Sequence, residues 1–356
     1  MLYLGLTNVL FILRYAVAGQ GRLRRQLYLI VLYSLFLFSA FRYQVGCDWF
    51  GYYFQYDAAT AFDWSTLTQI REPIWWAILA GINASGLPYP VANVISSAVF
   101  FIGIHVLARR QADPLGFLIL LFPILIINMP MSGIRQGAAI GLICIAFVAF
   151  IDRRPLLFCL WVLLSGGFHS SALLFLLLLP LTTGRYSINR LLLAGLLALP
   201  GVFFLASSDA AEVATSRYVG TGIDAAGAAF RVGILGLSAL YFFLFLRRKW
   251  STTFPQDYSL ALVGAIGMVL TVLLVPVSTV IGDRFGYYLI PIQTMIFARL
   301  PFLPFRRHAA FHMALPYLGL LLVFTVWSQL SSHFAQCYLP YQTWIFGFPG
   351  GDPVGF

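Results

Sequence analysis

Four short polar clusters interrupt this otherwise apolar sequence, and each carries side chains that could do chemistry. The cluster nearest the N-terminus contains Arg42, Asp48 and Tyr52. If Asp48–Tyr56 is helical, Asp48 and Tyr52 share one face of that helix. A carboxylate beside phenol and indole rings is typical of a sugar-binding surface, because aromatic faces stack on pyranose rings. The alternative is an aromatic belt at a membrane interface, with Asp48 paired to Arg42.

The second cluster places an arginine at the start of a helix. Pro130 and Gly133 break the backbone, so Arg135 falls in the first turn of the apolar helix that follows, with Gln136 beside it. A helix N-terminus offers free N–H donors and the positive end of the helix dipole, and a guanidinium adds a fork that matches phosphate. The alternative is an arginine that extends to the interface. Because an arginine opposes the dipole at this position, we favour a phosphate site.

The third cluster is a polar break around one histidine. Gly166 and Gly167 precede His169, which is followed by two serines. An imidazole titrates near neutral pH, so His169 could act as a general base. It could equally donate a hydrogen bond to a backbone carbonyl that the glycines leave free, and both interpretations stay open.

The fourth cluster lies at the expected start of a later helix. Arg284, Tyr287 and Tyr288 share one face by their spacing, and we expect Asp283 to cap the helix. Arg284 therefore repeats the arrangement of Arg135. Arg217 and Tyr341 are two further candidates for residues that bind a ligand.

Other catalytic and metal-binding patterns are missing from the sequence. It has no nucleotide-binding loop, no nucleophile elbow and no metal-type spacing of cysteines or histidines, so we expect neither a cofactor nor a metal. The cysteines Cys47 and Cys337 both fall in segments predicted to be external, where they could form a disulfide.

The composition determines the kind of scaffold that holds these clusters. Of the 356 residues, 60% are hydrophobic and only 10% are charged. An ordinary soluble domain has about 25% charged residues. This excludes a soluble domain, a disordered chain, a disulfide-stapled secreted fold and a nucleic-acid partner. We therefore expect an all-α, multi-pass protein of the lipid bilayer, built as a single membrane domain over residues 1–356.

About twelve apolar stretches approach the length of about 17–25 residues that a membrane-spanning helix needs. The two shortest are either tilted spans or a broken pair that meets at Gly166 and Gly167. The expected spans are Leu2–Ala18, Gln26–Phe41, Pro90–Ala108, Pro114–Asn128, Gln136–Ile151, Pro155–Ser165, Ser171–Leu181, Arg190–Ala206, Arg231–Leu246, Tyr258–Val277, Arg284–Ala298 and Ala309–Ser328.

The short loops predict the orientation of these helices. Fifteen of the 22 basic residues cluster in alternate loops, which we place in the cytoplasm. The surplus of positive charge therefore records orientation and not an anionic partner. Both termini and the segments 42–89, 207–230 and 329–356 are then external. Within the first segment, Pro73–Ile82 is predicted to be an interfacial or re-entrant helix, and Arg71-Glu72 an ion pair or a helix start.

Apart from Arg14, six arginines depart from this pattern: Arg42, Arg71, Arg135, Arg217, Arg231 and Arg284. A charge at membrane depth costs at least roughly 2.5–3.5 kcal/mol, so such residues usually face a cavity or a partner.

In their order and spacing, the motifs resemble those of the EpsG family, which is related to the Wzy-type polysaccharide polymerases. The resemblance extends from about Phe41 to Tyr341. The residues that carry it are Phe41-Arg42, Val45-Gly46-Cys47-Asp48, Tyr52, Arg71-Glu72-Pro73, Ile134-Arg135-Gln136, Phe168-His169-Ser170-Ser171-Ala172, Arg284 and Tyr287.

The resemblance implies a glycosyltransferase of the bacterial inner membrane with GT-C-like architecture. Such an enzyme would join repeat units carried on undecaprenyl diphosphate at the external face, alongside chain-length regulator and flippase proteins. We expect Asp48, in preference to His169, to activate the acceptor hydroxyl, because a carboxylate can also stabilise an oxocarbenium-like centre. The residues expected to bind the diphosphate or the sugars are Arg42, Arg135, Gln136, Arg217, Arg284, Tyr287, Tyr288, Tyr52 and Tyr341. The alternatives are a flippase for lipid-linked sugars and a membrane O-acyltransferase.

Overall fold

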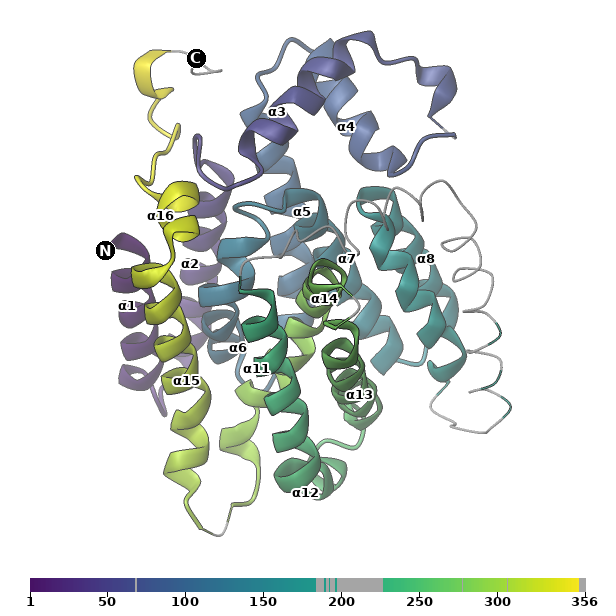
Figure 1. Cartoon of the computed structure of the whole chain (residues 1–356). Coiled ribbons are helices and arrows are strands. Elements are labelled where there is room, and N and C mark those ends of the chain that lie inside the picture. Colours follow the sequence, from purple (N-terminus) through teal and green to yellow (C-terminus); the bar gives the residue numbers. More distant parts are fainter. Residues whose placement is uncertain are drawn as a thin grey trace. The chain divides into compact units, whose positions relative to one another are not determined.

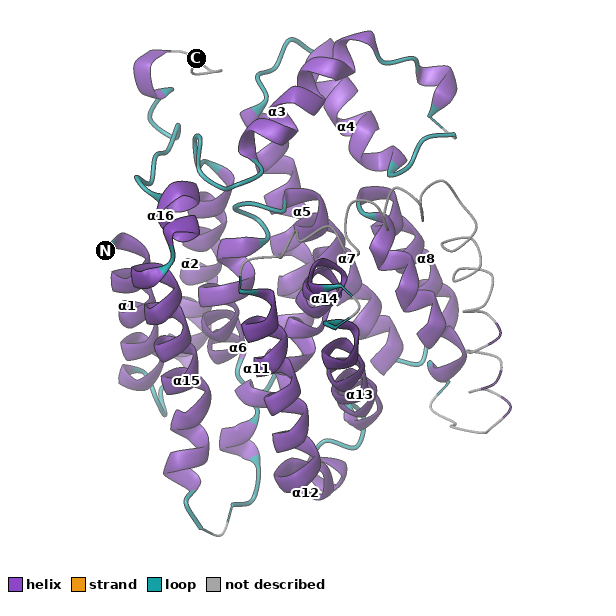
Figure 2. Cartoon of the chain, in the orientation of Figure 1, coloured by secondary structure: helices purple, strands orange, loops and turns teal. Residues whose placement is uncertain are grey.

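The computed structural model describes residues 1–183 and 227–351, except for 68, 277 and 306, together with residues 189, 192 and 196. Within these ranges the secondary structure is helical and contains no β-strand, as Figures 1 and 2 show. One isolated bridge pairs Arg42 with Thr343. The predicted all-α class is therefore confirmed.

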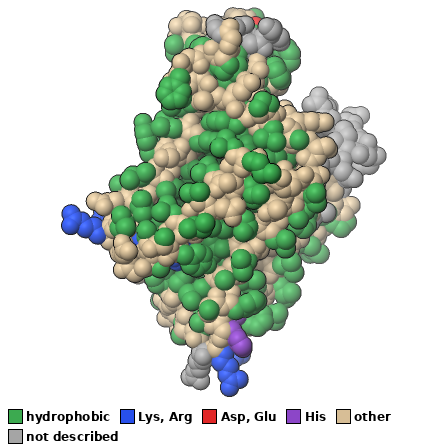
Figure 3. Space-filling model, turned by 90° about the vertical axis from the view of Figure 1, so that its left-hand side faces the viewer, with side chains coloured by type: hydrophobic (Ala, Val, Ile, Leu, Met, Phe, Trp, Pro, Cys, Tyr) green, Lys and Arg blue, Asp and Glu red, His purple; other side chains and the backbone are tan. Residues whose placement is uncertain are grey.

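The described residues contain five helices that are long and apolar enough to cross a membrane. Several shorter apolar helices accompany them, and exposed leucines such as Leu237 and Leu322 suit contact with lipid. On the face drawn in Figure 3, apolar side chains predominate and charged ones are few. The chain is thus a multi-pass membrane protein. The expected span Arg190–Ala206 lies outside the described residues, and the total of about twelve spans and the GT-C-like architecture stay predictions.

The chain divides into two compact units, which are described separately. The first consists of Met1–Cys144, Leu164–Ser170 and Arg307–Phe356. Its helices are α1 (Leu2–Ala16), α2 (Gly21–Ala40), α3 (Trp49–Ala58), α4 (Pro73–Ala84), α5 (Pro90–Ala108), α6 (Pro114–Leu121, continued by a π-helical turn over Phe122–Ile126), the first part of α7 (Ile134–Ile151), the last turn of α8 (Pro155–Phe168), α15 (Ala309–Leu330) and α16 (Ser332–Tyr338).

A buried carboxylate joins three helix ends of the first unit. Asp113 caps α6 by accepting a hydrogen bond from the Gly116 N–H. The same carboxylate forms ion pairs with Arg14, whose Nε lies 2.8 Å from Oδ2, and with Arg24. These arginines come from the end of α1 and the start of α2. Since the carboxyl group is only 2% exposed, the two cations supply the compensation that a buried charge needs.

Two glycines bring α5 and α7 into close contact. A methyl group on Gly103 would lie 1.8 Å from the Gly141 carbonyl oxygen, and one on Gly141 would lie 2.6 Å from the Phe100 Cα. Small residues commonly allow such close backbone approach between membrane helices. This contact fixes α7, which carries Arg135, against the centre of the first unit.

Segment 42–89, which is predicted to be external, contains the expected helices, with one correction. Helix α3 confirms a helix that includes Tyr52, with Asp48 exposed at its N-cap position, and α4 begins at Pro73 as expected. An interfacial helix would place Trp75 at the lipid headgroups. It is fully buried instead, and its indole N–H donates to Gln55 Oε1 at 2.9 Å.

Arg42 is a structural residue and does not have the substrate-binding role expected for it. Its guanidinium donates to the carbonyl oxygens of Ser39, Val45 and Met131 and to the Asn93 side-chain oxygen, at 2.8–2.9 Å. The residue is 1% exposed and its donors are taken by these oxygens, and it does not form the pair with Asp48 that the alternative interpretation proposed. Arg42 thereby binds the end of α2 to the turn before α7.

The second unit consists of Ile145–Leu163 and Ser171–Arg306. Three of its helices pack on one another: α11 (Ala228–Tyr241), α13 (Tyr258–Leu274) and α14 (Thr279–Ala298). A π-helical turn (Phe242–Leu246) and α12 (Arg247–Thr253) continue α11, and a 3₁₀ segment, η4, covers Ser170–Leu181. Arg299, at the end of α14, is buried, pairs with Asp257 and lies over the rings of Trp250 and Phe254.

The turn at Gly46 gives a testable prediction about stability. Gly46 has φ of 108°, and a methyl group there would lie 1.9 Å from the Met131 carbonyl oxygen that Arg42 also binds. Gly46→Ala should therefore lower stability by about 2–3 kcal/mol or more, through backbone strain and a clash with backbone. The measurement is the thermal melting midpoint of the purified protein in detergent.

Gly51→Ala is the matched control for this variant. Gly51 lies within α3 and needs no unusual φ, and a methyl group added there would have no atom within 4 Å. Alanine is the better helix former, so this change should leave the melting midpoint equal or slightly higher. Equal midpoints for the two variants would contradict the close approach at Gly46.

Candidate functional site

Glu72 is the centre of a polar cluster in the first unit. Its Oε2 accepts from Arg135 Nη1 at 2.5 Å. Its Oε1 lies 2.8 Å from His169 Nδ1 and accepts from the Ser170 backbone N–H at 3.1 Å. Three segments far apart in the sequence thus meet on one carboxylate.

The ends of three helices position these side chains. Glu72 precedes α4 and has a left-handed backbone conformation, with φ of 61°. Arg135 is the second residue of α7, and His169 directly follows α8. A methyl group on Gly167 would lie 2.6 Å from Ile74 Cδ1, so the last turn of α8 packs directly on the first turn of α4. Glycine at this position lets the imidazole reach the carboxylate.

The cluster is buried but accessible on one side. The side chains of Glu72 and His169 are 9% and 12% exposed, whereas that of Arg135 is 27% exposed. Burial raises the pKa of Glu72, but the hydrogen bond with His169 and the charge of Arg135 outweigh it and lower the pKa to about 2. The carboxylate is therefore ionised at any physiological pH.

The ionised carboxylate determines which imidazole nitrogen carries the proton. A carboxylate can only accept hydrogen bonds, so His169 Nδ1 must donate to it. In the neutral imidazole the proton is then absent from Nε2, which has no hydrogen-bond partner among the described residues. This leaves a lone pair that can take a proton from a bound hydroxyl.

Arg135 also contacts an aromatic ring of helix α3. Its guanidinium carbon lies 5.4 Å from the centre of the Tyr52 ring, and Tyr52 packs edge-on against Trp75. Its Nε is buried and has no hydrogen-bond partner within the described part of the chain. Arg135 thus has a fixed position and retains an unused donor.

The structure brings together three of the residues expected from the sequence, namely Arg135, His169 and Tyr52. It gives Tyr341 a packing role, because the ring stacks on Phe38 at 4.5 Å and the hydroxyl donates to the Phe38 carbonyl oxygen. Gln136 is buried, and Arg217 lies outside the described residues.

Sequence reasoning missed Glu72 as a site residue. It predicted an ion pair with Arg71 or a helix start, and only the helix start is confirmed, because Glu72 pairs with Arg135. One signal was available. Glu72 is an acidic residue immediately before a proline and a strongly apolar helix, where a charge is costly without a partner.

The fourth cluster, in the second unit, is arranged differently from the prediction. Ser278 caps α14 through the Ile281 N–H, so the expected N-cap role of Asp283 is wrong. Asp283 instead accepts two hydrogen bonds from Arg231, at 2.8 and 2.7 Å. Arg284 is exposed but is the sixth residue of α14, so it does not lie in the first turn as expected.

The two tyrosines of this cluster are both buried. Tyr287 lies under the Arg231 guanidinium at 5.6 Å, and the Tyr288 hydroxyl lies 3.1 Å from the Ser171 hydroxyl. These contacts hold α11, α14 and the start of η4 together. A role for either ring in binding a sugar stays a prediction.

A comparison with known proteins identifies the family. The EpsG family profile matches residues 25–343, which is most of the chain and includes Glu72, Arg135 and His169. No curated protein and no solved structure matches the chain. The length of the family match shows that this multi-pass membrane protein belongs to the EpsG family.

Proposed function

We propose that this chain is a polymerase of oligosaccharide repeat units linked to undecaprenyl diphosphate, in the synthesis of an exopolysaccharide, capsule or O-antigen. It would act at the external face of the bacterial inner membrane. Membership of the EpsG family supports a role in making polysaccharide. The observation that carries the proposal is the Glu72 carboxylate, held at once by Arg135 and His169.

In the proposed reaction, a sugar hydroxyl of the incoming lipid-linked unit attacks the anomeric carbon of the growing glycan. The bond from that carbon to the diphosphate oxygen breaks, and undecaprenyl diphosphate leaves with the electron pair. His169 Nε2 takes the hydroxyl proton, while Glu72 keeps the imidazole in the correct tautomer. No group on the chain needs to be oxidised, reduced or covalently modified.

The charges of the cluster suit this transfer. Glu72 and Arg135 neutralise each other while His169 is neutral. Once His169 holds the proton, the three groups carry one net positive charge, which appears as negative charge develops on the departing diphosphate. Arg135 is the most exposed member of the cluster, so we propose that it binds the diphosphate.

Asp48 and Arg284 have secondary roles in the proposed reaction. Asp48 is exposed at the N-cap position of α3, so it can contact an acceptor sugar, but the described residues hold it less firmly than they hold His169. Arg284 is exposed on α14 and is a further candidate for the diphosphate. The buried histidine with a fixed tautomer is the better general base.

The decisive assay uses the purified protein in liposomes with only a lipid-linked repeat unit. A ladder of longer glycans supports the polymerase. Movement of the unit across the bilayer without elongation would support the flippase. Transfer of an acyl group from an added acyl donor would support the acyltransferase.

The first prediction concerns the pair Glu72 and His169. Glu72→Gln and His169→Asn should each lower the rate of elongation by about 10²–10⁴-fold, the usual contribution of a positioned base. The double variant should lose little more, because the two residues act as one unit. The measurement is glycan-ladder formation at equal amounts of folded protein.

Asp57→Asn is the matched control, since Asp57 is an exposed carboxylate on α3 in the same external segment. It should leave elongation unchanged. Additive losses in the Glu72 and His169 double variant would rule out the proposed pair.

The second prediction concerns Arg135. Arg135→Ala should lower elongation by about 10²–10³-fold, as removal of a donor to developing charge does. Arg71→Ala removes an exposed cation next to Glu72 and should have little effect. Both variants are tested over a range of concentrations of the lipid-linked substrate. Equal losses of elongation rate in the two variants would show that Arg135 contributes only general positive charge.

The third prediction concerns stability at low pH. The carboxyl of a free glutamate titrates near 4.5, whereas the folded protein lowers the Glu72 pKa to about 2. Because the folded pKa is lower, ionised Glu72 contributes stability above pH 4.5, and this contribution, up to about 3 kcal/mol, is lost as pH falls toward 2.

Between about pH 6 and about pH 3, the thermal melting midpoint of the wild type should therefore fall further than that of Glu72→Gln. The variant lacks the titrating group, while every other carboxylate is shared by the two proteins. Parallel curves for the two proteins would contradict an ionised, buried Glu72.

A further inference from the structure

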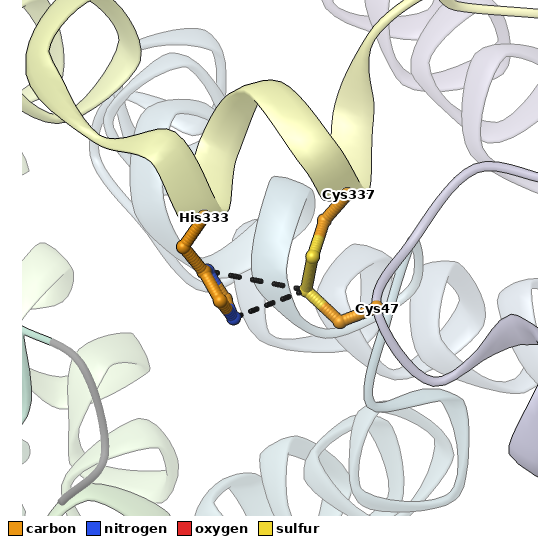
Figure 4. Close-up of side chains that lie close together, drawn as sticks. All are labelled: Cys47, His333 and Cys337. Carbon is orange, nitrogen blue, oxygen red and sulfur yellow. Dashed lines mark hydrogen bonds between the residues drawn. A yellow bond between two sulfur atoms is a disulfide. The ribbon is translucent and has the colours of Figure 1, made fainter.

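Two cysteines and a histidine of the first unit meet in a group that has no role in the proposed reaction, although Cys47 directly precedes Asp48. Cys47 and Cys337 form a disulfide, as the sequence allowed, and His333 Nε2 lies 3.4 Å from Cys47 Sγ (Figure 4). The sulfur and nitrogen atoms of the three residues lie within 4.8 Å of one another. Cys47 and His333 are exposed and Cys337 is partly exposed, so the group is open to solutes.

Contacts other than the disulfide hold both sides of this group in place. His333 and Cys337 are four residues apart on α16, so they share one face of that helix. The opposite face is anchored by Phe334 and Tyr338, whose rings pack on Trp327 with centres 4.9 and 5.8 Å away.

The Cys47 side is joined to α16 through the backbone. The Gly46 N–H donates to the Cys337 carbonyl oxygen at 2.7 Å, and the Tyr43 N–H donates to the Gln342 carbonyl oxygen at 2.9 Å. These hydrogen bonds do not involve sulfur. Cutting the disulfide would therefore leave the two thiols and the imidazole close together.

The spacing suits a tetrahedral metal ion. With Zn–S of about 2.3 Å and Zn–N of about 2.0–2.1 Å, a sulfur and a nitrogen on the same zinc lie about 3.5 Å apart. The observed separation of Cys47 Sγ and His333 Nε2 is 3.4 Å. The two sulfurs must move apart and Cys337 Sγ must move closer to the imidazole, by rotation of side chains that are at least partly exposed.

We propose that the reduced form of this group is a metal site that binds Zn²⁺ through Cys47, His333 and Cys337, with water as the fourth ligand. A dithiol supplies two electrons and two protons, which break the Cys47–Cys337 bond and give two thiols, and the dithiol becomes a disulfide. Zn²⁺ then replaces both thiol protons. Thiolate and imidazole ligands select zinc over hard cations such as Mg²⁺.

The disulfide and the metal are mutually exclusive, because both use the same sulfurs. Either one links residues 42–47 of the first external segment to the C-terminal segment that includes α16. The site therefore exchanges one cross-link for another when the redox conditions change, and the metal-bound link depends on available zinc.

Cobalt, which replaces zinc and is coloured, tests the proposal. The full-length protein in detergent is reduced with a dithiol, freed of reductant without air and titrated with Co²⁺. We expect thiolate-to-cobalt charge-transfer absorption that saturates at one Co²⁺ per chain and disappears when Zn²⁺ is added. The untreated, disulfide-bonded protein should show none.

Two variants complete the test. His333→Ala should weaken Co²⁺ binding by at least about tenfold. Loss of a residue that only supports a metal ligand already lowers metal affinity by about 10–100-fold, and His333 would be a ligand itself. The double change Cys144→Ser and Cys159→Ser removes the other two cysteines, which are free thiols in the structure, and should leave the absorption unchanged.

Absence of the absorption from reduced wild type, or its loss in the Cys144 and Cys159 variant, would overturn the proposal. So would unchanged affinity in His333→Ala. The comparison of reduced and oxidised wild type needs no substitution, so it holds even if a variant fails to fold.

Discussion

The buried negative charge of Glu72 is the constraint on which the arrangement of the site depends. A carboxylate that is 9% exposed is costly unless cations or N–H donors surround it. The start of α4, the start of α7 and the residue after α8 each contribute a group to that contact. Removing any one of them leaves the others with an uncompensated buried charge. The close packing of Gly167 on Ile74 then becomes intelligible, because this glycine lets the end of α8 approach the start of α4 closely enough for His169 to reach Glu72.

The same principle recurs elsewhere in the molecule. With only 10% charged residues, the chain uses several buried charges to join the ends of its helices. Asp113 joins the end of α1, the start of α2 and the start of α6. Arg42 joins the end of α2 to the turn before α7 without any acidic partner, by donating to three carbonyl oxygens and one amide oxygen. What distinguishes the Glu72 cluster is that it contains an imidazole, and the Nε2 of that ring has no hydrogen-bond partner among the described residues.

Local features of the sequence predicted the helices well and the partners of the charged side chains poorly. Runs of apolar residues located the spans, and prolines marked the starts of α4, α5, α6 and α8 correctly, because proline is favoured in the first turn of a helix. The start of α14 was placed five residues too late, because the charged pair Asp283-Arg284 resembles a helix start while a small serine cap lies upstream. Two of the partners of Arg42 lie 51 and 89 residues away along the chain, and the partners of Glu72 and Asp283 lie 63–98 and 52 residues away, so no local pattern contains these contacts. His333 is 286 residues from Cys47, which is why no metal-type spacing appears in the sequence.

Sharing one carboxylate between Arg135 and His169 also couples their chemistry. A histidine alone would gain a positive charge on accepting a proton in a poorly solvated site, which burial opposes. Glu72 offsets that cost, and since its own pKa is about 2 it does not compete for the proton. Arg135 binds the other oxygen of the same carboxylate, so the charge of Glu72 is shared between a permanent cation and the imidazole. An arginine without the carboxylate would repel a protonated histidine. In the proposed reaction, the three-way contact would therefore suit a proton that is taken up and released at each addition of a sugar unit.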